Sequence, residues 1–189
     1  MRNDPESYRR TETLPDGTLV EFRPITAQDR IPMVRFHNIL SERTVTGRYL
    51  QCLSFAERIQ HNRLEQVCQA DFVRELVYLV VLPGAGDGVD RVIAVGRIDC
   101  SAEDDNHLML VVADAWQDRG VGGLLLRFLI DLARREGMRR LKVRLHTENL
   151  PMRHLCREVG FFYGDPRDAD DVVEGVLDLA HAIDAHAPE

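Results

Sequence analysis

The sequence predicts a mixed α/β fold, in which one β-sheet carries helices on both faces. The first observation is a group of apolar runs, rich in β-branched side chains, in the middle of the 189-residue chain; such runs are typical of buried strands. The second is a strongly amphipathic helical segment at 121–136. The third is the composition, 44% hydrophobic and 29% charged, which is that of an ordinary globular domain.

The N-terminal part gives the weaker patterns. Residues 1–16 are polar and contain Pro5 and Pro15, so we expect a tail that ends in a turn. Residues 18–23 (TLVEFR) alternate between apolar and polar side chains as a strand does. Three helical segments are expected next, at 27–40 after an N-cap at Thr26, at 41–53 after an N-cap at Ser41, and at 55–70.

The central and C-terminal parts give clearer patterns. Three strands are expected in a meander, at 75–82, 91–100 and 107–113, and the helix at 121–136 ends at Gly137. The remaining elements are a strand at 140–146, a short helix at 151–158, and a hairpin of 161–163 with 174–179. We therefore expect one domain at 17–181 with a C-terminal tail at 182–189.

The charge and the cysteines exclude several classes of function. A net charge of −7 argues against a nucleic-acid partner, because neutralising phosphates needs a basic surface. No apolar run is long enough to span a bilayer, and the N-terminus has no apolar signal region, so we expect a cytoplasmic protein without a membrane partner. The four cysteines form no C-x-x-C pair, which predicts free thiols and no metal site.

The candidate chemistry lies between the third central strand and the amphipathic helix. Gly120, Gly122 and Gly123 stand where the loop becomes the helix. Glycines let a backbone approach a ligand closely, and the first N–H groups of a helix attract anions. The glycines fit neither the Walker A pattern nor G-x-G-x-x-G. A tight strand-to-helix turn without a ligand stays open as the alternative.

The residue pattern of this segment resembles that of a known superfamily. Gln117-Asp118-Arg119-Gly120-Val121-Gly122 fits the Q/R-x-x-G-x-G/A signature of the GNAT N-acetyltransferases, and 148–152 with 159–161 resembles their N-x-x-(A/M)…GF element. Upstream, the segments 21–25, 48–50 and 71–75 look like those of the Pat-type bacterial protein lysine acetyltransferases. The resemblance covers roughly residues 18–180.

The resemblance implies a GNAT acyl-CoA N-acyltransferase fold with a mixed, mostly antiparallel sheet, and acetyl-CoA as the acyl donor. It implies that the cofactor lies where the strands 107–113 and 140–146 splay apart, with its pyrophosphate at the helix start and its pantetheine along the first strand. The cofactor-binding residues implied are Leu110, Val111, Val112, Gln117, Asp118, Arg119, Gly120, Val121, Gly122, Gly123 and Asn149.

The catalytic base is the point at which the chain departs from the family. The family usually places a glutamate nine residues before the aromatic residue of the cofactor loop, and counting back from Trp116 gives His107. An imidazole can act as a base near neutral pH, although a lone histidine is also a common structural residue. Glu103, in the acidic segment before the strand, is the second candidate and would act through water.

The acceptor is expected to be a primary amine. A protein lysine, as in the Pat-type enzymes, and a small-molecule amine are both compatible with the sequence. The histidine in place of the glutamate keeps open a third function, an acyl-CoA-binding sensor without turnover. The resemblance is compatible with a monomer or a homodimer.

Overall fold

The computed structural model describes residues 4–50, 53–84, 90–100, 106–164 and 171–180. Its centre is one eight-stranded sheet in the order β1-β2-β3-β4-β5-β6-β8-β7, in which only the β5–β6 pair is parallel. The strands are β1 (Arg10–Thr13), β2 (Leu19–Pro24), β3 (Glu75–Leu82), β4 (Arg91–Asp99), β5 (Asn106–Val112), β6 (Arg140–His146), β7 (Phe162–Tyr163) and β8 (Val172–Asp178). The predicted mixed, mostly antiparallel sheet is confirmed.

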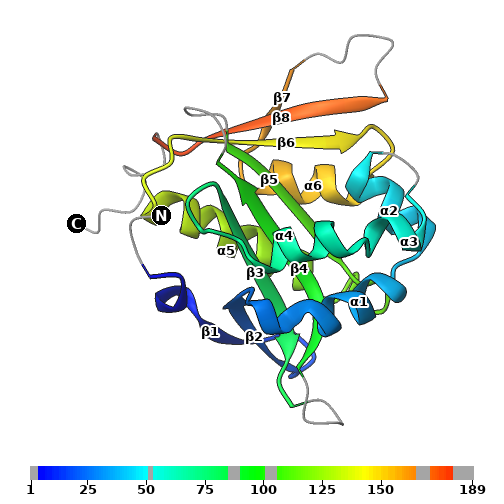
Figure 1. Ribbon diagram of the computed structural model, residues 1–189. Coiled ribbons are helices and arrows are strands. Elements are labelled where there is room, and N and C mark those ends of the chain that lie inside the picture. Colours follow the sequence, from blue (N-terminus) through cyan, green and yellow to red (C-terminus); the bar gives the residue numbers. More distant parts are fainter. Residues whose placement is uncertain (1–3, 51–52, 85–89, 101–105, 165–170, 181–189) are drawn as a thin grey trace.

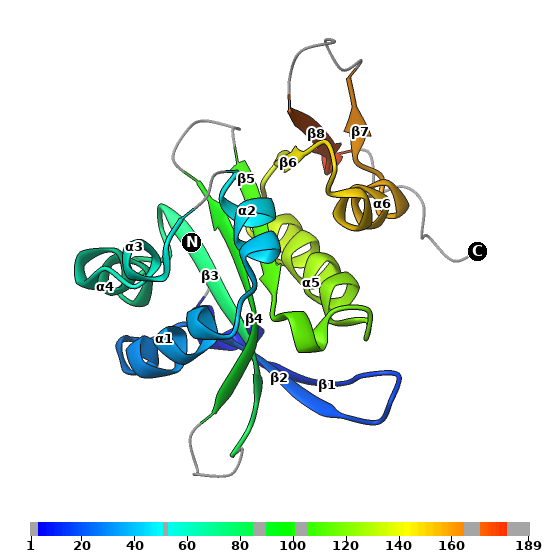
Figure 2. The same cartoon turned by 90° about the vertical axis from the view of Figure 1, so that its right-hand side faces the viewer.

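The helices cover both faces of this sheet (Figures 1 and 2). The long helix α5 and the helix α6 lie on one face, and α1, α3 and α4 lie on the other. The helices are α1 (Arg30–Asn38), α2 (Glu42–Tyr49), α3 (Phe55–Arg58), α4 (His61–Cys68), α5 (Val121–Arg135) and α6 (Leu150–Glu158), with short 3₁₀ turns at Pro5–Tyr8, Ala27–Asp29 and Asp114–Trp116.

Two apolar cores result, one on each face. The larger joins α5 and α6 to the sheet and contains Leu125, Leu129 and Cys156, each fully buried. The smaller joins α1, α2 and α4 to the opposite face and contains Phe36 and Val45. Because successive residues of a strand point to opposite faces, β3 is apolar along almost its whole length and serves both cores.

The expectation of an N-terminal tail is wrong for residues 4–13. Arg10–Thr13 forms β1, which pairs antiparallel with β2, and Tyr8 is buried, with its hydroxyl donating to Glu136 at 2.7 Å. The alternating exposure of β1 explains the error, since its sequence RTET carries no apolar face that a pattern could reveal. The expected tail at 182–189 lies outside the described residues.

The expected helix at 55–70 is two helices. The chain leaves the helical conformation at Gln60, which has φ −45° and ψ 130°. Ile59 and Leu64 both pack in the smaller core, and a spacing of five residues would place them on different sides of a continuous helix. The break lets both side chains face the sheet.

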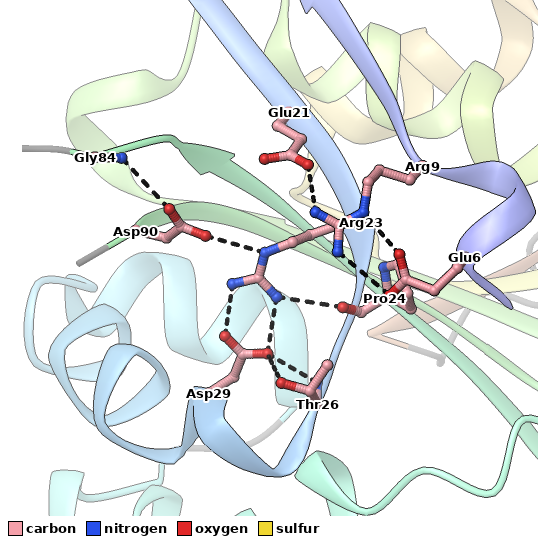
Figure 3. A network of polar contacts seen from close by, with 9 residues as sticks. All are labelled: Glu6, Arg9, Glu21, Arg23, Pro24, Thr26, Asp29, Gly84 and Asp90. Atoms are coloured by element: carbon pink, nitrogen blue, oxygen red, sulfur yellow. Dashed lines mark hydrogen bonds and ion pairs between the residues drawn. The ribbon is translucent and has the colours of Figure 1, made fainter. Parts of the chain in front are cut away.

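A buried ion-pair network fixes the start of α1 against the sheet (Figure 3). The Arg23 guanidinium on β2 donates to both carboxylate oxygens of Asp29, at 2.8 and 2.6 Å. It also pairs with Asp90, before β4, at 3.2 Å. Burial raises the pKa of Asp29, but hydrogen bonds from Arg23 and Thr26 outweigh it and hold that pKa below its usual value. The predicted N-cap at Thr26 is present as a capping box with Asp29.

Candidate functional site

The two parallel strands of the sheet stay paired only at their first residues. Asn106 pairs with Leu141 and His107 with Lys142, and no later residue of β5 is paired with β6. The Asn106 side chain donates to the Arg140 carbonyl oxygen at 3.0 Å, which fixes the paired end. Beyond it, residues 108–112 of β5 have no partner on β6, which leaves a strand edge with which another extended molecule can pair.

The helix α5 begins beside the far end of β5. Gly120 is its N-cap, with φ +85°, a conformation that favours glycine. No side chain caps this end, and the first turn carries no acidic residue. The first N–H groups of α5 therefore lack both a helical acceptor and a nearby carboxylate of their own turn, which suits an anion.

Val121, Gly122 and Gly123 form the first turn of α5. Val121 is buried, and an added Cβ on Gly122 would lie 3.5 Å from Leu155 and 3.7 Å from Val112. An added Cβ on Gly123 would lie 3.3 Å from the Arg127 guanidinium. The first turn thus packs closely against α6 and the end of β5. In the loop before it, Asp118 has a positive φ of +57°.

Gln117 binds the loop to its surroundings through its side-chain amide. Its Nε2 donates to the Val112 carbonyl oxygen at 3.1 Å and to the Thr44 hydroxyl at 3.0 Å. The residue that opens the sequence signature therefore ties the end of β5 to α2. Leu110 packs in the larger core and Val111 in the smaller, so their side chains lie on opposite faces of the sheet. The backbone edge of β5 at these residues faces the gap where β5 and β6 part.

The helix α2 contacts the segments that follow β5 and β6, the two strands that part from each other. At its start, Asp114 accepts from the Ser41 N–H at 2.9 Å, from the Ser41 hydroxyl at 2.5 Å and from the Thr44 hydroxyl at 2.8 Å. Further along, an added Cβ on Gly47 would lie 3.5 Å from the Asn149 amide nitrogen. Figure 2 shows α2 in front of β5, on the side toward α6. The predicted N-cap at Ser41 is present, but sequence reasoning missed its contact with Asp114 and the role of Thr44, because these partners are far apart in the chain.

Asn149 has a local structural role that the sequence pattern did not show. Its side-chain oxygen accepts from the Met152 N–H at 3.3 Å and caps α6. Its amide nitrogen faces Gly47 on α2. The candidate cofactor residue thus stands between α6 and α2, next to the end of β6.

Arg119 is held on the outer side of the loop. Its guanidinium lies 4.0 Å from the centre of the Trp116 ring and pairs with the Asp16 carboxylate in the β1–β2 turn. The hydrogen bond from Arg119 is the main reason that the pKa of Asp16 falls to about 2. Asp16 belongs to the turn expected after the tail, but nothing in the local sequence pointed to this partner.

His107 lies in a row of titratable residues across four strands. In register, Glu75 pairs with Asp99, Asp99 with His107, and His107 with Lys142, and directly paired side chains share a face. Burial raises the pKa of the Glu75 carboxyl, Arg97 opposes that change, and Asp99 adds to it. His107 is half-buried at the last paired residues before the divergence. The second candidate, Glu103, lies outside the described residues.

Cys156 lies on the face of α6 that packs against the sheet. Its side chain is fully buried in the larger core, and burial raises the pKa of its thiol to about 11. Cys156 is therefore a packing residue of α6. Within the described residues no group of three side chains could hold a metal ion, and no described helix has the length and apolarity to cross a membrane.

Comparisons with known proteins identify the family. The family model described as the acetyltransferase (GNAT) family matches residues 47–161. The chain is similar to an acetyltransferase of Pseudomonas aeruginosa, with 31% identity over 89% of this chain and 88% of the relative.

Three solved structures share the fold. The GNAT domain of PAT from Streptomyces lividans has a TM-score of 0.80 at 24% identity, over 93% of this chain and 99% of that chain. RimJ of Mycobacterium smegmatis, in complex with CoA-disulfide, has a TM-score of 0.67 at 15% identity, over 93% and 88%. The PaiA N-acetyltransferase of Thermoplasma acidophilum, in complex with coenzyme A, has a TM-score of 0.62 at 14% identity, over 82% and 97%. With these relatives and this arrangement of strands, the chain belongs to the GNAT family of acetyltransferases and is an acetyl-CoA-dependent acyltransferase.

Proposed function

We propose that the chain transfers an acetyl group from acetyl-CoA to the side-chain amine of a protein lysine. The observation that carries the proposal is the two-residue pairing of β5 with β6, which ends beside the uncapped start of α5. An extended pantetheine arm can pair with the strand edge at Leu110, Val111 and Val112. The phosphates then meet the N–H groups from Arg119 to Gly123, and Asn149 closes the other side.

The chain's own residues would contribute position, charge stabilisation and a proton acceptor. Acetyl-CoA supplies the activated acetyl group when it is bound. A backbone N–H of β5 would donate to the oxygen that becomes negative as the amine attacks. A lysine amine is protonated at neutral pH, so a base must take its proton, and His107 stands at the point where the strands part.

The lysine acceptor is supported by the similarity to the Streptomyces lividans PAT domain and by the upstream segments that resemble Pat-type enzymes. A small-molecule amine would meet the same chemistry, and the acceptor panel below separates the two.

The proposal is tested by two assays on the purified protein. Calorimetry compares acetyl-CoA, CoA and pantetheine, and thiol release is followed against lysine peptides, polyamines and small amines. We expect binding that depends on the phosphates, and release that is fastest with a lysine peptide. Release only with small amines would refute the lysine acceptor, binding without release would favour the sensor, and no binding would refute the site.

Replacing the imidazole tests the proposed base. We expect His107→Gln to lower the rate about 100-fold and to change its pH profile, as loss of a general base does. The control is His154→Gln, on the exposed surface of α6, which should keep both the rate and the pH profile.

An unchanged rate and pH profile in His107→Gln would show that His107 is not the base. The same measurements on Glu103→Gln would then test the alternative in which a carboxylate acts through water.

A further inference from the structure

The turn between β1 and β2 is held rigid by its own hydrogen bonds. The Leu14 N–H donates to the Thr18 carbonyl oxygen and the Gly17 N–H to that of Leu14, each at 2.9 Å. The Thr18 N–H donates to one oxygen of Asp16 at 2.9 Å. Leu14 is buried in the larger core and anchors the turn. The second oxygen of Asp16 is left to face outward from the turn.

This turn packs directly on the start of α5. An added Cβ on Gly120 would lie 3.3 Å from the Pro15 ring. The outward oxygen of Asp16 accepts from two nitrogens of Arg119, with the Nε contact at 3.1 Å. Figure 2 shows the hairpin of β1 and β2 below α5. The hairpin therefore forms a further wall beside the loop that precedes α5, contributed by a segment outside the family signature.

The position of Asp16 has a chemical consequence. The helix start and Arg119 attract an anion, yet the Asp16 carboxylate already forms an ion pair with the Arg119 guanidinium. Any phosphate that approaches Arg119 meets this carboxylate as a competitor with the same sign of charge. Both partners are partly exposed, with 38% and 40% of their side-chain surface accessible, so solvent moderates the competition without abolishing it.

We propose that Asp16 sets the affinity of the chain for the phosphates of CoA by competing with them for Arg119. The inference rests on the proposed function, because it assumes that CoA phosphates bind at the start of α5. Asp16 thus acts as an affinity-setting residue that weakens cofactor binding. A lower affinity favours release of CoA after each turnover.

The test is calorimetry with CoA and with pantetheine, which lacks the phosphates, on wild type and Asp16→Asn. Asparagine keeps an oxygen for the Thr18 N–H and removes the charge. We expect Asp16→Asn to bind CoA about three- to fivefold more tightly at low salt, with less gain at high salt and no change for pantetheine. The matched control is Asp131→Asn, an exposed carboxylate near the other end of α5, which should bind CoA as wild type does.

A second comparison uses Arg119→Gln, alone and combined with Asp16→Asn. If Asp16 competes for Arg119, Asp16→Asn should no longer raise the affinity for CoA when Arg119 is replaced. An equal rise in affinity in the Arg119→Gln variant would overturn the proposal. If wild type binds CoA while Asp16→Asn binds it equally or more weakly, this inference fails and the proposed function stands. If wild type does not bind CoA, the proposed function itself fails. Asp16→Ser, whose hydroxyl can also accept from Thr18, replaces Asp16→Asn if the latter lowers the melting temperature.

Discussion

Gly120 and Gly122 are two residues apart, yet an added methyl group meets different conditions at each. Gly120 has φ +85°, and the Pro15 ring stands 3.3 Å from the position of its Cβ. Gly122 is in the helix, with its nearest contacts at ordinary van der Waals distance. Side chains other than glycine are strained at positive φ. The first glycine is thus required by the backbone, whereas the backbone conformation at the second does not require glycine.

We therefore expect Gly120→Ala to lower the free energy of unfolding by about 1–2 kcal/mol. Gly122→Ala should leave it unchanged or raise it by about 0.5–1 kcal/mol, because alanine favours the helix. Urea unfolding of the two variants measures both effects. Equal losses at the two positions would contradict the strain at Gly120.

The short helix α2 owes its position to polar contacts at its first turn. Asp114 accepts three hydrogen bonds from Ser41 and Thr44, and Gln117 adds one to Thr44. Hydrogen bonds to a carboxylate are stronger than neutral ones. The helix and the loop before α5 therefore form one hydrogen-bonded unit.

Thr44→Val should loosen this unit. We expect a loss of about 1 kcal/mol in unfolding free energy, a higher KM for both substrates, and faster hydrogen exchange in α2 than in wild type. Thr44→Ser keeps the hydroxyl and should restore all three properties. Faster exchange throughout the chain, without a change confined to α2, would speak against a local tether.

The sequence predicted elements better than it predicted contacts between them. The strands at 75–82 and 140–146 were predicted with the bounds that the structure has, because a run of apolar or alternating side chains is a local property. β1 was missed because its pairing with β2 decides its conformation. The segment Gln117–Gly123 was singled out from its glycine spacing and its signature. Its contacts with Asp16 and Thr44 join residues far apart in the chain, which a local sequence pattern does not reveal.

At the scale of the whole molecule, the Arg23–Asp29 pair joins the sheet to the helical layer over the smaller core (Figure 3). Only 8% and 4% of the two side-chain surfaces are exposed. Removing Asp29 would leave the buried Arg23 charge with Asp90 as its remaining ion-pair partner among the residues of this network, and the loss of one partner of a buried pair is strongly destabilising. The network therefore contributes to global stability, at a distance from the chemistry proposed around β5.

Asp29→Asn should lower the free energy of unfolding by about 3 kcal/mol at neutral pH. The folded pKa of Asp29 lies below the unfolded value near 3.9, so this contribution is complete above that value and is lost as the pH falls through the folded pKa. The difference between wild type and variant, followed by urea unfolding, should shrink below about pH 4. A difference that stays constant down to pH 2 would contradict the assignment, and Asp131→Asn serves as the exposed control.

The brief contact between β5 and β6 also divides the sheet into two antiparallel parts. β1 to β5 form one part, and β6, β8 and β7 form the other. Among the described residues, the backbone pairing between the two parts is confined to 106–107 with 141–142, and the rest of the boundary is a seam between β5 and β6. In the function proposed above, acetyl-CoA would lie along this seam and supply interstrand hydrogen bonds, so that the substrate would act as a temporary ninth strand of the enzyme that consumes it.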